Sequence, residues 1–204
     1  RSALPARSEM CIRDRYAADG VFSEGPLAVA VVTADCLPIL MSSRDGRVVA
    51  ALHGGWQGLV AGIVGAAVAR FNARGVASAD IRVAIGPGIK ACCYEVSAGF
   101  IEALQVGHGR LWEGAAPPWS QRRPLPERPP RFAPPEPRQA EQGAWLDLVA
   151  FCRQLFQAAG VGPAQIEASA VCTYCSGDAF ASHRRRQRLG EEKRQQYAWI
   201  ARKP

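Results

Sequence analysis

The chain has 204 residues, of which 48% are apolar and 21% are charged. This composition predicts one globular domain with a sizeable core. No run of about 18 apolar residues occurs, so the sequence predicts no membrane span. The seven cysteines are irregularly spaced and are expected to be reduced thiols of a cytoplasmic protein, not a disulfide framework.

The net charge of +7 is concentrated near the C-terminal end. Residues 183–204 contain eight Lys or Arg residues and two Glu residues, so the remainder of the chain is nearly neutral. A local basic cluster of this kind fits a small anionic ligand such as phosphate as well as it fits a nucleic acid. The net charge alone therefore does not identify a nucleic-acid-binding protein.

Strand and helix patterns alternate along the chain. Short runs rich in Val, Leu and Ile predict strands at 27–33, 37–41, 47–52, 81–85, 166–172 and 196–201. Apolar residues at helical spacing predict helices at 59–71, 97–104 and 145–159. This alternation indicates an α/β or α+β class.

A proline-rich segment interrupts the pattern from residue 113 to residue 142. Nine of the 15 prolines lie between Pro117 and Pro137, interleaved with Arg and Glu. No helix or central strand tolerates that density of proline. We therefore expect an exposed, mobile loop inserted into the domain; a proline-rich ligand for another protein is the less favoured interpretation.

A cysteine and a histidine follow two of the predicted strands. Cys36 comes after 27–33, and His53 comes after 47–52 and opens a Gly-Gly-Trp turn. Neighbouring strands can bring both side chains to one edge of a sheet, where thiolate and imidazole would bind zinc or copper. Spacing alone leaves two alternatives open, a Cys–His nucleophile pair and a packed core in which Cys36 is a small hydrophobe.

Three further features could bind or activate a substrate. Arg184 and Arg185 offer forked donors that match phosphate oxygens, although such clusters are usually solvated. Gly86 and Gly88 flank a proline after a predicted strand, where backbone N–H groups could face an anion or simply reverse the chain. Glu95 is a candidate general acid or base, or an ordinary capped carboxylate.

The remaining cysteines give a weaker signal. Cys172 and Cys175 form a single CxxC, and no second CxxC exists. Cys92 and Cys93 are adjacent and are expected to point in different directions. A redox or zinc-ribbon site is therefore not favoured. Trp56 is interpreted as a core anchor in preference to a platform for a nucleobase.

Four ordered motifs resemble the YfiH-like family, whose members are also labelled multicopper polyphenol oxidases or laccases. They are TADCLP at 33–38, HGGWQG at 53–58, AIGPGIKACCYEV at 84–96 and CTYCSGDAFASHRRR at 172–186. YAADG at 16–20 and YAWIA at 197–201 extend the resemblance over about 16–201. Residues 1–15 match nothing in the family and are interpreted as a non-family segment ahead of a single domain at 16–204.

The resemblance implies an α/β/β/α layered sandwich. It also implies phosphorolysis of purine nucleosides to free base and ribose 1-phosphate, with deamination of adenosine as a second activity. Cys36 and His53 would then be two of three ligands to zinc, or to copper. Asp35 would orient a ligand or cap the local turn, and Arg184 or Arg185 would position phosphate.

The third ligand implied by the resemblance is a histidine in a Gln-Val-His-Gly segment upstream of Cys36, which this sequence lacks. We therefore expect weak zinc binding. His108 and His183 are the only histidines that could substitute. His183 is the better placed because it lies beside the arginines, but family members often have Tyr or His at this position, so the resemblance implies that it is not a metal ligand.

Two other functions compete with the nucleoside enzyme. In one, copper at the same site oxidises phenols; a single mononuclear site fits that four-electron chemistry poorly. In the other, residues 184–203 recruit a non-catalytic module to nucleic acid. The favoured partners are small molecules, a purine nucleoside and phosphate, with no nucleic acid and no membrane. The oligomeric state is left open.

Overall fold

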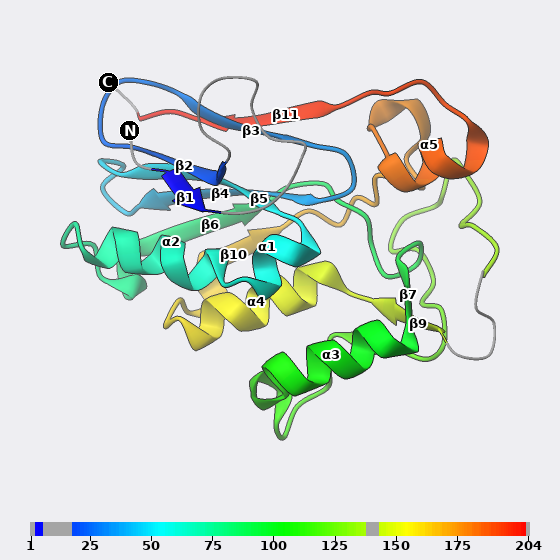
Figure 1. Ribbon diagram of the computed structural model, residues 1–204. Helices are drawn as coiled ribbons and strands as arrows, with labels where there is room; N and C mark the ends of the chain where they lie inside the picture. Colours follow the sequence, from blue (N-terminus) through cyan, green and yellow to red (C-terminus); the bar gives the residue numbers. More distant parts are fainter. Residues whose placement is uncertain (1–2, 6–17, 138–142, 203–204) are drawn as a thin grey trace.

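A computed structural model describes residues 3–5, 18–137 and 143–202, and it confirms the mixed α/β class (Figure 1). Its main element is a six-stranded sheet with the order β1-β2-β5-β4-β6-β10. The strands are β1 (Ala3–Pro5), β2 (Ala18–Ser23), β4 (Leu37–Ser43), β5 (Val49–Gly54), β6 (Ile81–Ile85) and β10 (Ile166–Ala168). Only β6 and β10 pair in parallel.

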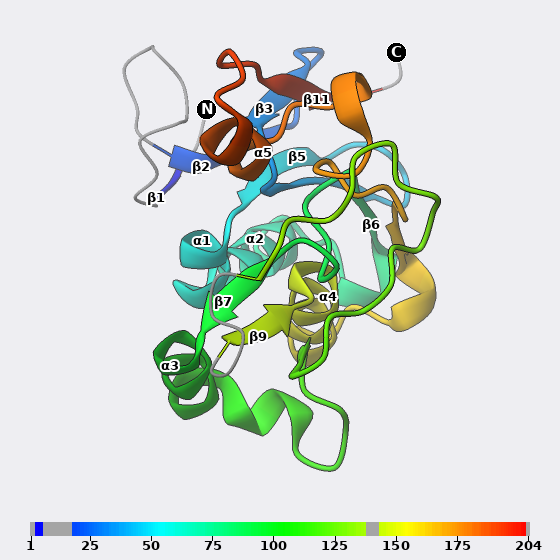
Figure 2. The same cartoon turned by 90° about the vertical axis from the view of Figure 1, so that its right-hand side faces the viewer.

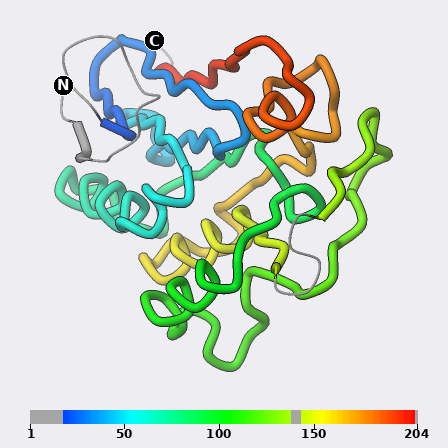
Figure 3. The backbone as a smooth tube through the Cα atoms, turned by 45° about the vertical axis from the view of Figure 1, so that its right-hand side comes forward, coloured from blue at the N-terminus to red at the C-terminus, as the bar shows by residue number. Residues whose placement is uncertain are grey.

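A two-stranded antiparallel ribbon forms a second layer. It pairs β3 (Val29–Thr33) with β11 (Gln196–Ile200), and it lies along one face of the main sheet (Figures 1 and 3). A small apolar cluster joins the ribbon to the sheet through Val29, Val31, Val49 and Ala51. The last strand of the chain therefore packs beside one of the first.

Helices cover the opposite face of the sheet. They are α1 (Trp56–Val60), α2 (Ile63–Asn72) and α4 (Leu148–Ala158), and α3 (Ala98–His108) lies beyond α4 (Figure 1). The main core between these layers contains Ile39, Met41, Phe71 and Phe151, all at most 1% exposed. The helix expected at 59–71 is two helices, because Gly62 has a left-handed φ of 87° and begins α2.

The proline-rich segment is held by the domain at several points. Within it, β8 (Trp119–Ser120) pairs with β9 (Gly143–Leu146), which pairs in turn with β7 (Glu95–Ser97). The guanidinium of Arg123 lies 4.3 Å from the Trp145 ring centroid. Proline prevented a long helix or strand here, as expected, yet the described part of the segment packs against neighbouring elements. Residues 138–142 lie outside the described residues.

The basic segment forms a short helix that the sequence analysis did not anticipate, α5 (His183–Leu189), at one end of the β3–β11 ribbon (Figure 2). Its side chain cap is Ser182, which accepts a hydrogen bond from the Arg185 N–H. Short 3-10 turns complete the structure at Ser78–Asp80, Gly109–Trp112, Pro163–Gln165 and Gly177–Ala179. No helix in the described ranges is long and apolar enough to cross a membrane.

Candidate metal and anion site

Cys36 and His53 converge on one small space at the edge of the main sheet. Strands β4 and β5 pair with Leu37 opposite Gly54 and Pro38 opposite His53, so Cys36 stands level with Gly55. A Cβ placed on Gly55 would lie 3.2 Å from Cys36 Sγ and 3.7 Å from His53 Nε2. The two donor atoms therefore border the same space. Because Gly55 has no side chain, this space is open to an ion or a ligand atom.

Asp19 orients the His53 ring from behind. Its Oδ1 lies 3.4 Å from His53 Nδ1, and both side chains are 3% exposed. The β2–β5 register pairs Gly20 with Leu52, so one step further brings Asp19 level with His53. A carboxylate on Nδ1 favours the tautomer that presents Nε2 as a metal ligand. Sequence analysis noted this aspartate only within YAADG, because the pairing of β2 with β5 was not predictable.

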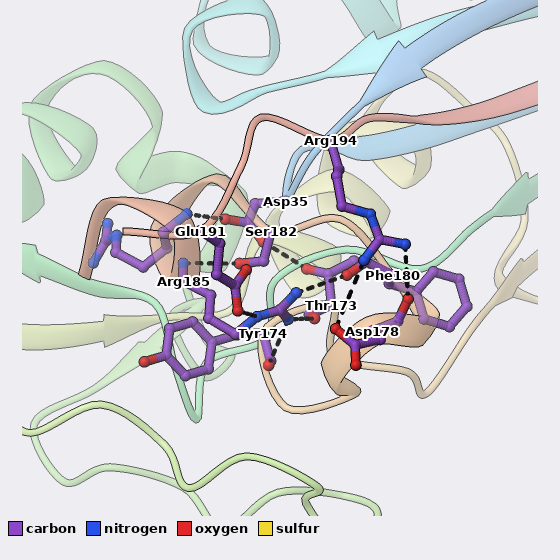
Figure 4. Close-up of polar contacts among 10 residues, drawn as sticks. Asp35, Thr173, Tyr174, Asp178, Phe180, Ser182, Arg185, Glu191 and Arg194 are labelled. Atoms are coloured by element: carbon purple, nitrogen blue, oxygen red, sulfur yellow. Dashed lines mark hydrogen bonds and ion pairs between the residues drawn. The ribbon is translucent and has the colours of Figure 1, made fainter. Parts of the chain in front are cut away.

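The Asp35 carboxylate accepts hydrogen bonds from two other segments of the chain. Its Oδ1 accepts a hydrogen bond of 2.7 Å from the Thr173 hydroxyl, and its Oδ2 accepts one of 2.6 Å from the Arg184 N–H (Figure 4). Burial raises the pKa of Asp35, and the Arg184, Thr173 and Ser182 donors oppose that rise. Asp35 thus attaches the turn before Cys36 to the start of α5.

The two adjacent arginines have different surroundings. Arg185 is 1% exposed and donates to the carbonyls of Thr173, Tyr174 and Phe180 and to the Glu191 carboxylate, at 2.7–3.0 Å (Figure 4). Phosphate binding by Arg185 would require those bonds to break. Its surroundings are those of a residue that holds the fold together, which leaves Arg184 as the candidate anion ligand of the pair.

Arg184 lies on the other side of the Cys36 turn, against Tyr94. Its guanidinium carbon is 5.4 Å from the Tyr94 ring centroid, and Nη1 donates to the Glu95 carbonyl at 3.3 Å. Burial raises the pKa of Tyr94; the charge of Cys36 raises it further and that of Arg184 lowers it, which indicates that the three groups are neighbours. A cation, a phenol and a thiol therefore share one region.

Glu95 is directed towards a different cation. Its carboxylate is 6% exposed, and Oε2 lies 3.8 Å from Arg188 Nη2 on α5. This ion pair joins the start of β7 to α5. The general acid or base role remains a prediction.

The glycine turn at 86–88 serves close packing. The Gly86 N–H donates to the Pro38 carbonyl at 2.8 Å, so this donor is not directed at a ligand. A Cβ on Gly86 would lie 2.7 Å from Pro38 Cγ, and one on Gly88 would lie 2.5 Å from Leu37 Cδ2. These contacts give both glycines a steric reason to be there and do not support the anion site predicted for them.

The other two histidines make contacts elsewhere. His183 Nδ1 lies 3.2 Å from Arg186 Nη2, and the His108 ring packs edge-on against Phe151. Within 3–5, 18–137 and 143–202, no further His, Cys, Asp or Glu completes a set of three metal ligands with Cys36 and His53. A cavity of about 550 Å³ at the C-terminal end of α3 is lined by His108 but by none of the other candidate residues.

Trp56 is not the core anchor that the sequence suggested. It follows Gly55 directly, is 39% exposed, and packs edge-on against Phe100 with the ring centroids 5.1 Å apart. An exposed aromatic ring therefore stands one residue from the space between Cys36 and His53.

A second group of thiols lies nearby, and here the expectation from sequence was wrong. Cys92, Cys93, Cys172 and Cys175 are all buried, and their four sulfur atoms lie within 4.8 Å of one another. The adjacent Cys92 and Cys93 face the same space, with Sγ atoms 3.6 Å apart. The adjacent pair Cys92 and Cys93 thus completes a group of four thiols with the CxxC of Cys172 and Cys175, without a second CxxC.

Comparison with known proteins agrees with this architecture. The model of a family described as multi-copper polyphenol oxidoreductase laccase matches residues 5–200. The chain belongs to that family. The match begins upstream of Tyr16, where the resemblance had placed the start of the domain; residues 6–17 lie outside the described part of the structure.

Relatives in the family carry nucleoside-enzyme names. The chain is 35% identical over 172 residues to purine nucleoside phosphorylase YlmD of Geobacillus stearothermophilus, covering 82% of this chain and 54% of the relative. It is 32% identical over 159 residues to adenosine deaminase RL5 of an unknown prokaryote, covering 78% and 53%. The chain thus spans about half the length of these curated relatives.

Solved structures show the same fold. The crystal structure of YlmD from Geobacillus stearothermophilus superposes with a TM-score of 0.72 at 31% identity, covering 91% of this chain and 61% of that one. Bacillus licheniformis YfiH superposes with a TM-score of 0.70 at 30% identity, covering 92% and 62%. The resemblance to the YfiH-like family is confirmed.

Proposed function

We propose that this chain carries the metal and phosphate sites of a purine nucleoside phosphorylase that also deaminates adenosine. The observation that carries the proposal is the convergence of Cys36 Sγ and His53 Nε2 beside Gly55, with Asp19 behind the imidazole. The names of the relatives support the substrate class. The activity is proposed for the whole protein, because this chain spans about half the length of the curated relatives it matches.

The residues at the convergence fit a zinc or copper ion. Thiolate and imidazole are ligands that both metals accept, and Gly55 leaves room for an ion between them. When bound, such an ion lowers the pKa of a water molecule towards neutrality, which is the chemistry that deamination needs. Cys36 and His53 would hold it, and Asp19 would keep the Nδ1 proton in place so that Nε2 stays a ligand.

Arg184 is the proposed phosphate ligand. In phosphorolysis a phosphate oxygen bonds to the ribose anomeric carbon, the bond to the purine nitrogen breaks, and its electron pair leaves with the base. Among the described residues the Arg184 side chain makes one hydrogen bond, to the Glu95 carbonyl. Its remaining N–H groups can bind phosphate oxygens and hold the nucleophile in line with the sugar.

Trp56 is the proposed contact for the purine ring. Its exposed side chain adjoins Gly55, so a nucleoside whose sugar faces Arg184 can place its base against the indole. Stacking of a base on an aromatic side chain contributes about 1–3 kcal/mol where it has been measured. Removal of the ring should therefore weaken nucleoside binding more than phosphate binding.

Two separate assays test the proposal. On one zinc-defined preparation, Cys36→Ser and His53→Ala should abolish ammonia release from adenosine, because each removes a metal ligand. Arg184→Ala should raise the phosphate KM for hypoxanthine release from inosine at least tenfold. Arg194→Ala is the matched control from the same basic segment, because its side chain is exposed and pairs with Asp178.

Three outcomes would count against the proposal. Full deaminase turnover by the Cys36 variant would contradict the proposed metal site. An unchanged phosphate KM in the Arg184 variant would contradict the proposed phosphate site. Oxidation of phenols without nucleoside turnover, on the same preparation loaded with copper, would favour the oxidase function.

A further inference from the structure

Four buried cysteines meet where two loops cross behind the candidate site. The loop after the glycine turn carries Cys92 and Cys93, and the turn after β10 carries Cys172 and Cys175. The loops are joined by a parallel bridge between Gly88 and Cys172, with the Thr173 N–H donating to the Gly88 carbonyl at 3.1 Å. The four thiols thus come from two segments about 80 residues apart in sequence.

The spacing of the sulfur atoms matches a tetrahedron around one ion. The Sγ–Sγ separations are 3.6 Å for Cys92–Cys93, 3.9 Å for Cys92–Cys175 and 3.3 Å for Cys93–Cys175. A zinc–sulfur distance of about 2.3 Å places the corners of a tetrahedron about 3.8 Å apart. Iron–sulfur cubanes hold their cysteines on different irons and so spread them more widely.

We propose that Cys92, Cys93, Cys172 and Cys175 bind one structural zinc ion, separate from the Cys36–His53 site. The donor set is the four-thiolate type that selects zinc over harder cations. All four side chains are buried, which is typical of a closed structural site and leaves no position for a substrate.

The surroundings of the thiols carry positive charge. Four thiolates around Zn²⁺ have a net charge of −2, which burial would disfavour without nearby cations. The buried Lys90 belongs to the same loop as Cys92 and Cys93 and donates to the Ser169 carbonyl. Arg185 binds the carbonyls of Thr173 and Tyr174, between the two cysteines of the CxxC.

The proline-rich segment closes the site. The backbone N–H groups of Arg131 and Phe132 both donate to the Cys175 carbonyl, at 2.8 and 3.1 Å. A Cβ on Gly177 would lie 2.9 Å from the Phe132 ring, so the segment presses closely on the turn after the CxxC. These contacts give the inserted segment a role as a cover over the thiols.

The ion would fix the geometry of the candidate site from behind. Tyr94 follows Cys93 directly and stacks under Arg184, whereas Thr173 follows Cys172 and donates to Asp35. One ion joining the two loops would therefore hold Arg184 and the turn before Cys36 at a constant separation. A metal at this position contributes to stability and positioning, not to bond making.

Metal content provides the first test. The full chain, expressed with zinc and dialysed against a mild chelator, should retain about one ion in Cys36→Ser, because that variant lacks only the weaker site. Cys175→Ser should lose this ion. Cys152→Ala is the matched control: Cys152 is fully buried in α4, outside the thiol group, and its loss should leave the zinc content unchanged.

Spectroscopy provides a second test on a folded protein. Zinc X-ray absorption of Cys36→Ser should show a shell of four sulfurs at about 2.3 Å, and cobalt substitution should give the intense visible bands of tetrahedral thiolate ligation. Zinc absent from Cys36→Ser, or a shell containing nitrogen or oxygen, would overturn the proposal. So would a denatured thiol count, without reductant, that shows two of the four cysteines joined as a disulfide.

Discussion

Replacing Arg185 by methionine should unfold the protein at much lower urea concentration without a specific effect on phosphate. The side chain is 1% exposed and donates four hydrogen bonds, three to carbonyls and one to the Glu191 carboxylate. Methionine fills similar space but provides no donor, so three buried carbonyls and a carboxylate would lose their partner. Removing one member of a buried charged pair costs about 3–5 kcal/mol, and because the Glu191 side chain is 28% exposed we expect the lower end of this range, about 3 kcal/mol.

That cost is a large fraction of a typical total of about 5–15 kcal/mol. It would be measured by urea titration followed by tryptophan fluorescence, with the free energy of unfolding taken from the midpoint and slope. Arg184→Met is the matched control, since Arg184 is half-buried and its side chain donates one hydrogen bond among the described residues, to the Glu95 carbonyl. We expect it to lower the free energy of unfolding by less than about 1 kcal/mol.

A free energy of unfolding for Arg185→Met within about 1 kcal/mol of that of the parent chain would refute the structural role of Arg185. It would also be refuted if this variant kept its stability and lost affinity for phosphate, because Arg185 would then be the anion ligand. A large loss of stability in Arg184→Met would show that the roles of the two arginines are reversed.

Three further substitutions test the Cys36–His53 space and the turn that contains Asp45. Gly55→Ala should lower metal retention, since its Cβ would lie 3.2 Å from Cys36 Sγ; Gly65→Ala, which meets nothing within 4 Å, is the control. Asp19→Asn should weaken metal binding about 10–100-fold in a competition titration, and an unchanged affinity would refute its orienting role. The Ser43 hydroxyl holds the pKa of Asp45 well below its usual 3.8. This stabilisation is present above pH 3.8 and lost below it, so the Tm of Asp45→Asn should fall below the parent at neutral pH and converge with it in acid.

The sequence predicted four of the six strands of the main sheet, β4, β5, β6 and β10, and both strands of the β3–β11 ribbon. Runs rich in Val and Ile placed β3, β4, β5, β6 and β11 within a few residues of their observed bounds, because buried strands have a distinctive composition. The broken helix at Gly62 was missed, since isolated glycines inside helical patterns are often tolerated. The α5 helix was missed because six of its seven residues are polar and show no apolar periodicity.

The candidate site was predictable only where it depends on neighbouring strands. Cys36 directly precedes β4 and His53 lies near the end of β5, and these two strands form a hairpin, so the approach of the two side chains could be expected. Asp19 depends on the pairing of β2 with β5, and the thiol group depends on two loops crossing. Such long-range pairings leave no local pattern, and the adjacent Arg184 and Arg185 acquire different roles only from tertiary contacts.

The attachment of Asp35 to Thr173 and Arg184 has a consequence for biosynthesis. These hydrogen bonds join residues separated by 138 and 149 positions. A nascent chain cannot make both hydrogen bonds until translation has passed residue 184, so the turn before Cys36 lacks this support while residues 36–184 are synthesised. Ribosome pausing before residue 184 should therefore prolong the interval in which the protein is open to proteolysis near this turn.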